Sequence, residues 1–274
     1  MSHEFEIKPP SKINIGIKEL IEYKELFYFF SWRDIKVKYK QTVLGFLWVI
    51  LQPLFMTLIF TFFLGESIVE KTKLNIPYTL FALSGMLLWG VFSSGVLNSS
   101  NSMLNNAHII KKIYFPRLII PISSILVALV DFLVTFFVFI ILLFIYRAEI
   151  NYFALILVPF SVLIICLAAM GCGSFLAALN IKYRDVRYVI PFIIQGLLFL
   201  SPVLYPINMS NNVVLEFLFK INPVSGALEL IRGIFSGYDI NYNLVFTSSV
   251  SSILLFIMGV IYFKKTESYF ADIV

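Results

Sequence analysis

The chain has 274 residues, of which 59% are hydrophobic, 17% are aromatic and only 14% are charged. Soluble domains average roughly 25% charged residues, so a soluble protein of this length would lack the polar surface that it needs. The formal net charge is +5 at pH 7. The basic residues border apolar runs instead of forming one face, so the charge is interpreted as membrane topology and argues against nucleic-acid binding.

Six long apolar runs follow one another along the chain, at residues 43–64, 78–97, 118–146, 152–179, 188–204 and 244–263. The hydrocarbon core of a bilayer needs ~20 apolar residues per helix. The run at 188–204, with seventeen residues, is marginal, and the other five are long enough. The sequence therefore predicts an all-α polytopic membrane protein with six transmembrane helices.

Basic residues are distributed unequally between the segments that join these runs. Sixteen of the 21 lysines and arginines lie before the first run, at 98–117, at 180–187 or after the last run. Because cytoplasmic loops retain Lys and Arg, these segments are expected inside the cell. Both termini are therefore predicted to be cytoplasmic, with residues 1–40 forming a cytoplasmic segment and residues 41–274 the transmembrane domain.

The N-terminal segment carries a helical pattern from residue 17 onward. Leu20, Tyr23, Phe27 and Phe30 recur with a period near 3.6, while charged residues take the opposite side. This pattern predicts an amphipathic helix lying in the inner membrane interface. A soluble helix that docks on a partner is the alternative. Four bases follow directly before the first run and can contact anionic lipid headgroups: Arg33, Lys36, Lys38 and Lys40.

The segment at 205–243 is neither polar enough for a solvent loop nor apolar enough to span. It divides into two short helical stretches, 213–221 and 226–235, separated by Asn222 and Pro223 and closed by Gly237. Non-helical backbone at membrane depth is tolerated only inside protein or beside water. We therefore predict a re-entrant helical pair that acts as an outer gate between the fifth and sixth helices. Two helices lying flat on the outer surface are the alternative.

Asp131 is the only ionisable residue deep inside an apolar run. A charge there costs ~2.5–3.5 kcal/mol on insertion scales, so the side chain should face protein or water. A proton relay would need a second ionisable partner in the runs, and they offer none. We expect a structural role, with a hydrogen bond to a serine or threonine of a neighbouring helix.

The fourth run also holds a stripe of small residues, in which Ala169, Gly173 and Ala177 recur at every fourth position. Such stripes let helix backbones approach closely, within one chain or between two. The only cysteines, Cys166 and Cys172, lie in the same run, six residues apart. They have neither disulfide nor metal-site spacing and are interpreted as core residues.

The sequence lacks the residues that most membrane-bound catalysts need. It contains no G-x-x-x-x-G-K-[ST] phosphate loop, and its only histidines are His3 and His108. A catalytic triad or a His-ligated metal centre within the membrane is therefore not expected. We predict no catalytic, cofactor or metal site on this chain, and a conduit whose energy comes from elsewhere.

Four stretches, in order, resemble the membrane subunits of type-2 ABC transporters that export bacterial cell-surface polysaccharides. They are 33–53 (RDIKVKYKQTVLGFLWVILQP), 106–121 (NAHIIKKIYFPRLIIP), 179–206 (LNIKYRDVRYVIPFIIQGLLFLSPVLYP) and 222–232 (NPVSGALELIR). The resemblance implies two copies working with two separate ATPase subunits, which bind the ATP and Mg. It also implies a lipid-linked glycan as cargo (O-antigen, capsule or teichoic acid) and a place in the bacterial cytoplasmic (inner) membrane.

The segment at 104–115 mixes basic residues with Ile and aromatic residues, which is typical of a short helix pressed into a partner's groove. It is similar to the family's coupling helix, which receives the motion of the ATPase. An ordinary amphipathic loop on the membrane is the alternative. Residues 182–187 form the second cytoplasmic contact, where Asp185 can pair with Arg184 or Arg187. The predicted ATPase-coupling residues are His108, Lys111, Lys112, Tyr114, Arg117, Arg184, Asp185 and Arg187.

Aromatic side chains suit a passage for sugars, because they offer apolar faces without fixed charges and tyrosine adds a polar tip. The predicted lining residues of the conduit are Trp48, Phe55, Trp89, Phe92, Phe199 and Tyr205. For each of them the alternatives are a place in the aromatic belts at the membrane interfaces or in a contact between helices. For the whole chain, the competing functions are a type-2 exporter of a drug or lipid, a stand-alone secondary carrier or channel, and a membrane-bound scaffold or enzyme.

Overall fold

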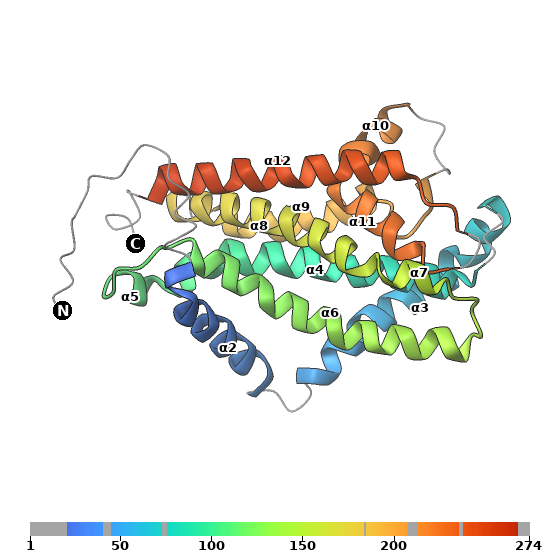
Figure 1. The fold of residues 1–274 in the computed structure, drawn as a ribbon, viewed down its shortest axis with the longest axis horizontal. Coiled ribbons are helices and arrows are strands. Elements are labelled where there is room, and N and C mark those ends of the chain that lie inside the picture. Colours follow the sequence, from blue (N-terminus) through green and yellow to red (C-terminus); the bar gives the residue numbers. More distant parts are fainter. Residues whose placement is uncertain are drawn as a thin grey trace.

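A computed structural model describes residues 21–40, 45–72, 76–183, 185–207, 213–235 and 238–267. Figure 1 shows most of its long helices running roughly along the length of the molecule, with some of them tilted. The helices are α2 (Lys24–Lys40), α3 (Gly45–Thr72), α4 (Tyr78–Asn105), α5 (Ala107–Ile110), α6 (Ile119–Ile145), α7 (Tyr152–Leu155), α8 (Val158–Lys182), α9 (Val186–Leu200), α10 (Val213–Ile221), α11 (Pro223–Arg232) and α12 (Tyr242–Thr266). Among the described residues, five of them are long and apolar enough to cross a membrane: α3, α4, α6, α8 and α12. The prediction of an all-helical multi-pass membrane protein is confirmed.

The helices do not end where the apolar runs end. α3 continues to Thr72, well past the apolar run at 43–64, and α4 continues to Asn105, past the run at 78–97. A helix needs only its backbone hydrogen bonds, so it outlasts the apolar stretch until a breaking residue intervenes. The run at 152–179 is divided into α7 and α8, because a proline in the first turn of α8 starts a new helix there.

The fifth apolar run forms a shorter helix than a spanning segment requires. α9 has 15 residues and ends at Leu200, because the backbone of the following Ser201 is extended. At 1.5 Å per residue it is ~22 Å long, less than the ~30 Å of a hydrocarbon core. Residues 201–205 then form a turn rather than the last turn of a span.

The centre of the bundle consists of α4 and α8, with α6 and α12 beside them. In the most apolar stretch of α4, 72% of the residues are buried, against 6% in that of α3. α3 is therefore a peripheral helix that exposes most of its apolar surface outside this chain.

The stripe of small residues in α8 allows this close packing. A Cβ atom at Gly173 would lie 2.5 Å from Ser99 of α4, and one at Gly171 would lie 2.4 Å from the carbonyl oxygen of Leu255 in α12. On the facing helix, a Cβ atom at Gly259 would lie 2.0 Å from the carbonyl oxygen of Gly171. The neighbours of the stripe therefore belong to the same chain, a question that the sequence left open.

Candidate functional site

The segment predicted to couple with an ATPase lies at one end of the bundle, which we call the α5 end (Figure 1). Residues 104–115 do not form one short helix there. α4 ends at Asn105, α5 covers only Ala107–Ile110, and residues 113–116 are not helical. Asn106 separates the two helices, and its side chain donates to the carbonyl oxygen of Ser102 at 2.8 Å.

This segment has an exposed face and a buried face. His108, Lys111 and Lys112 are exposed, and the side chain of Tyr114 is 90% exposed. Ile110 and Phe115 are buried in a hydrophobic cluster that also contains residues of α2, α4, α6, α8 and α12. The segment therefore presents basic and aromatic groups outward while two apolar side chains fix it to the bundle.

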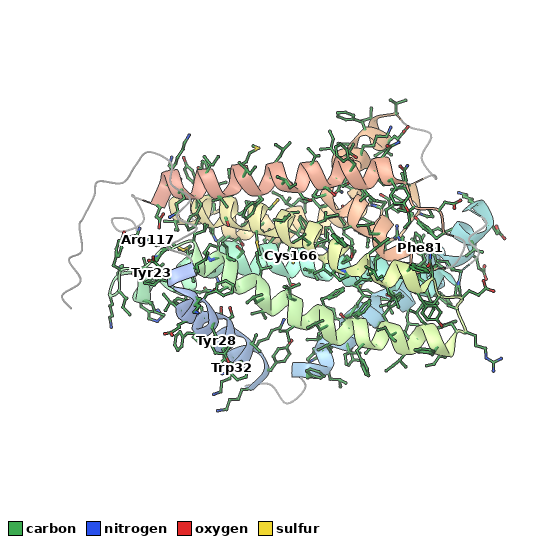
Figure 2. All side chains as sticks on the ribbon, in the orientation of Figure 1. Tyr23, Tyr28, Trp32, Phe81, Arg117 and Cys166 are labelled. Carbon is green, nitrogen blue, oxygen red and sulfur yellow. The ribbon has the colours of Figure 1, made fainter. Side chains whose placement is uncertain are left out.

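Arg117 connects this segment to the last spanning helix. Its guanidinium donates to the backbone carbonyl of Glu267 at 2.6 Å, and its backbone N–H donates to Oε1 of the same residue at 3.2 Å. Lys264 forms an ion pair with the Glu267 carboxylate at 2.9 Å. The same segment also contacts α2, because the ring centroid of Phe115 lies 5.7 Å from that of Phe30. Figure 2 shows Arg117 at this end of the molecule, far from Phe81.

The second predicted contact, at 182–187, lies between α8 and α9. Lys182 lies over the ring of Tyr183, 5.1 Å from its centroid. Asp185 and Arg187 are both exposed, and these two described residues form no ion pair with each other. The structure therefore does not pair Asp185 with Arg187, and the alternative pairing with Arg184 stays a prediction. Arg184 lies outside the described residues.

Asp131 has a partner that the sequence argument did not find. Lys38, near the end of α2, forms an ion pair with the Asp131 carboxylate at 2.5 Å, and the hydroxyl of Tyr39 donates to its other oxygen. The predicted hydrogen bond to a serine or threonine of a neighbouring helix is wrong, because the two carboxylate oxygens contact Lys38 and Tyr39. Thr135, in the same helix, donates to the backbone carbonyl of Asp131. Burial, together with the hydrogen bond and the negative charge of Asp131, raises the pKa of Tyr39. We call these three side chains the α2–α6 clasp.

The predicted conduit residues fall into two groups. Trp48 and Phe55 on α3 are 59% and 64% exposed, and Phe199 on α9 is 57% exposed. Tyr205 is half-buried and donates a hydrogen bond to the carbonyl oxygen of Phe199 at 2.6 Å.

Trp89 and Phe92 are placed differently. Both are 6% exposed and lie in the main hydrophobic core, where the centroids of their rings are 5.5 Å apart. The prediction that these two line a conduit is corrected, because α4 is the most buried of the five spanning helices and directs them into the interior of this chain.

The opposite end of the bundle, the α10 end, contains the predicted helical pair. α10 has the predicted bounds, and only Phe219 within it is buried. α11 begins at Pro223, after Asn222 caps it by accepting from the backbone N–H of Val224 at 2.9 Å. Every residue of α11 is buried. The pair therefore consists of one helix that is buried in the bundle, α11, and one that lies mostly outside it, α10.

Two buried charged residues of α11, Glu229 and Arg232, were not predicted from the sequence. Arg232 is fully buried, donates to the carbonyl oxygen of Val203 at 2.7 Å and lies 3.7 Å from the ring centroid of Phe81. Glu229 accepts from the hydroxyl of Tyr238 at 2.7 Å. Their spacing of three residues on a helix rich in small residues was the available signal, since it puts both on one face.

Comparison with known proteins agrees with this arrangement. Residues 25–236 match the family described as ABC-2 type transporter. The chain is 30% identical over 242 residues to the O-antigen export system permease protein RfbA of Klebsiella pneumoniae, covering 88% of this chain and 92% of the relative. It is 25% identical to RfbA of Myxococcus xanthus over 92% of this chain and 97% of the relative. The polysialic acid transport protein KpsM of Escherichia coli is 27% identical over 86% and 92%. The chain belongs to the ABC-2 type transporter family, as a multi-pass membrane protein.

Proposed function

We propose that this chain is the membrane-spanning subunit of an ATP-driven exporter that moves a lipid-linked polysaccharide across the bacterial cytoplasmic membrane. The observation that carries the proposal is similarity along nearly the whole chain to permeases named for O-antigen export and polysialic acid transport. The exposed aromatic rings of α3 and α9 support it, since they offer flat apolar surfaces without fixed charge.

In this proposal the α5 end faces the cytoplasm, as do both termini. The distribution of basic residues supports this orientation. α9 and the turn at 201–205 together form the fifth of the six crossings in chain order, completed at the outer side by α11. The α10–α11 pair is re-entrant, and the burial of every residue of α11 supports its placement at membrane depth. α2 lies at the inner interface, where its exposed rings Tyr28, Phe29 and Trp32 contact lipid.

The working unit is two copies of this chain with two separate ATP-binding subunits, which hold the ATP and Mg. The exposed group formed by His108, Lys111, Lys112 and Tyr114 receives the ATPase, together with the exposed Asp185 and Arg187. The conduit lies between the two copies, with Trp48, Phe55, Phe199 and Tyr205 as lining residues. The low burial of α3 within a single chain supports a location facing the other copy.

Deletion of the gene tests the cargo. Cells that lack this chain should accumulate undecaprenyl-linked glycan inside and should lose it at the surface, with recovery when the chain is restored. Unchanged surface glycan would refute the proposal, and accumulation of a drug or an unmodified lipid would instead favour an exporter of that class.

Purification in mild detergent tests the partner. A nucleotide-binding chain should copurify in equal amount with this one, and ATP hydrolysis should depend on it. Transport by the isolated chain alone would instead indicate a stand-alone carrier.

A further inference from the structure

The α2–α6 clasp joins three helices at one point. Lys38 and Tyr39 of α2 both contact the carboxylate of Asp131, at the thirteenth of the 27 residues of α6. The ring of Tyr39 also lies 6.0 Å from the ring of Phe46 in the first turn of α3. The clasp therefore holds the end of α2 and the start of α3 against the middle of α6.

The segment on both sides of the clasp has no packed core of its own. We call residues 32–40 and 45–56 the elbow, and none of these described residues is buried. Burial begins on one side at Phe30 and Ser31 of α2 and on the other side at Thr57 of α3. The elbow is thus attached by packing mainly at its ends, where Leu54 of α3 also packs against the main core, and at its middle by the polar contacts of the clasp.

Polar contacts and packing differ in how they respond to movement. A packed apolar surface resists separation along its whole area, whereas one ion pair and one hydrogen bond separate together over a short distance. The clasp is also partly accessible, with 37% of the Lys38 side chain and 18% of the Asp131 side chain exposed. Water or a lipid headgroup can therefore satisfy the separated groups.

Two of the four remaining conduit candidates are carried by the elbow itself. Trp48 and Phe55 lie on α3, 59% and 64% exposed, on either side of its Pro53. Movement of the elbow away from α6 would displace both rings relative to the bundle.

We propose that the clasp formed by Lys38, Tyr39 and Asp131 is a releasable latch: it holds the elbow against α6 at rest and separates when cargo is exported. The three residues are positioning residues, which act through α3 and do not contact the cargo. This inference rests on the proposed export function and adds a moving part to it.

Spin labels report the elbow position while leaving the clasp intact. The complex with its ATPase is prepared with the native Cys166 and Cys172 replaced by alanine, and labels are attached through Val37→Cys on α2 and Phe144→Cys on α6, both exposed positions. Pulsed electron–electron double resonance should show one distance between the two labels at rest and a second, longer distance during ATP turnover. The matched pair Phe144→Cys and Met258→Cys, which joins α6 to α12, should show the same distance in both states.

Variants of the clasp test whether it is the part that holds the elbow. Lys38→Gln and Asp131→Asn should each show the longer distance already at rest and should lose export while ATP turnover continues. The charge exchange Lys38→Asp with Asp131→Lys should restore the short resting distance and recover part of the export.

Each outcome decides a separate point. A single unchanged distance in a complex that exports would overturn the latch. A longer distance during turnover in the parent, with Lys38→Gln unchanged at rest, would also overturn it, because the elbow would then move without being held by the clasp. Absence of glycan export in the parent complex would instead refute the proposed function, while the resting distance of Lys38→Gln would still test the contact.

Discussion

Replacing Gly259 with alanine tests the closest approach between two helices of the bundle. The added Cβ atom would lie 2.0 Å from the carbonyl oxygen of Gly171, whereas ordinary contact begins at 3.4 Å. The obstacle is backbone, so α8 and α12 must separate by more than ~1 Å along their contact. A gap of that size removes roughly a quarter to a half of the dispersion energy of each atom-to-atom contact that it widens.

Overpacking of a close-packed interior costs ~1–3 kcal/mol, and rigid backbone on both sides puts Gly259→Ala at the upper limit, about 3 kcal/mol. For a chain of this size that corresponds to a fall in Tm of roughly 10 °C. The measurement is the fraction of monodisperse protein that remains after heating in detergent.

Gly90→Ala in α4 is the matched control, because no atom lies within 4 Å of the added Cβ there. It should leave Tm unchanged or raise it slightly, since alanine favours a helix over glycine by ~0.5–1 kcal/mol. Equal melting of Gly259→Ala and the parent protein would refute the close approach of α8 and α12.

Two further changes test the two ends of the bundle. Combined replacement of Lys111, Lys112 and Tyr114 by alanine should leave membrane insertion intact but uncouple ATP turnover from export, because these exposed groups form the proposed ATPase contact; unchanged export per ATP would count against that assignment. Arg232→Ala should destabilise the chain by ~3–5 kcal/mol in a melting assay, since it removes a buried cation near Glu229. Lys220→Ala should cost only ~0.3–0.5 kcal/mol, because its ion pair with Glu216 is exposed, and a similar effect of the two variants would contradict the burial of Arg232.

Local patterns in the sequence predicted the elements whose boundaries have a local cause. The bounds of α10 were predicted correctly because Asn222 and Pro223 interrupt the helix directly after it. α3 and α4 were predicted too short, since hydropathy follows the bilayer whereas a helix follows its backbone hydrogen bonds. The single helix predicted over 104–115 failed because Asn106 ends α4 there.

The contacts of the candidate site depend on residues distant in sequence, which no local pattern reports. Lys38 was assigned to lipid headgroups because it lies in a basic cluster, but the fold places it on Asp131. Trp89 and Phe92 have the composition expected of a conduit lining, and only the position of α4 at the centre shows that they are core residues. The aromatic rings of α3 and α9 remain candidates because those helices are peripheral.

The separation of Lys38 and Asp131 by 93 residues also bears on how the chain is made. Translation proceeds at ~5–20 residues per second, so Lys38 leaves the ribosome roughly 5–20 seconds before Asp131. The Lys38 side chain is therefore already at the membrane when α6 is released from the insertion machinery. The carboxylate of Asp131 can therefore meet its counter-ion as α6 enters the bilayer, so that the one costly residue of the most apolar spanning helix is compensated when that helix inserts.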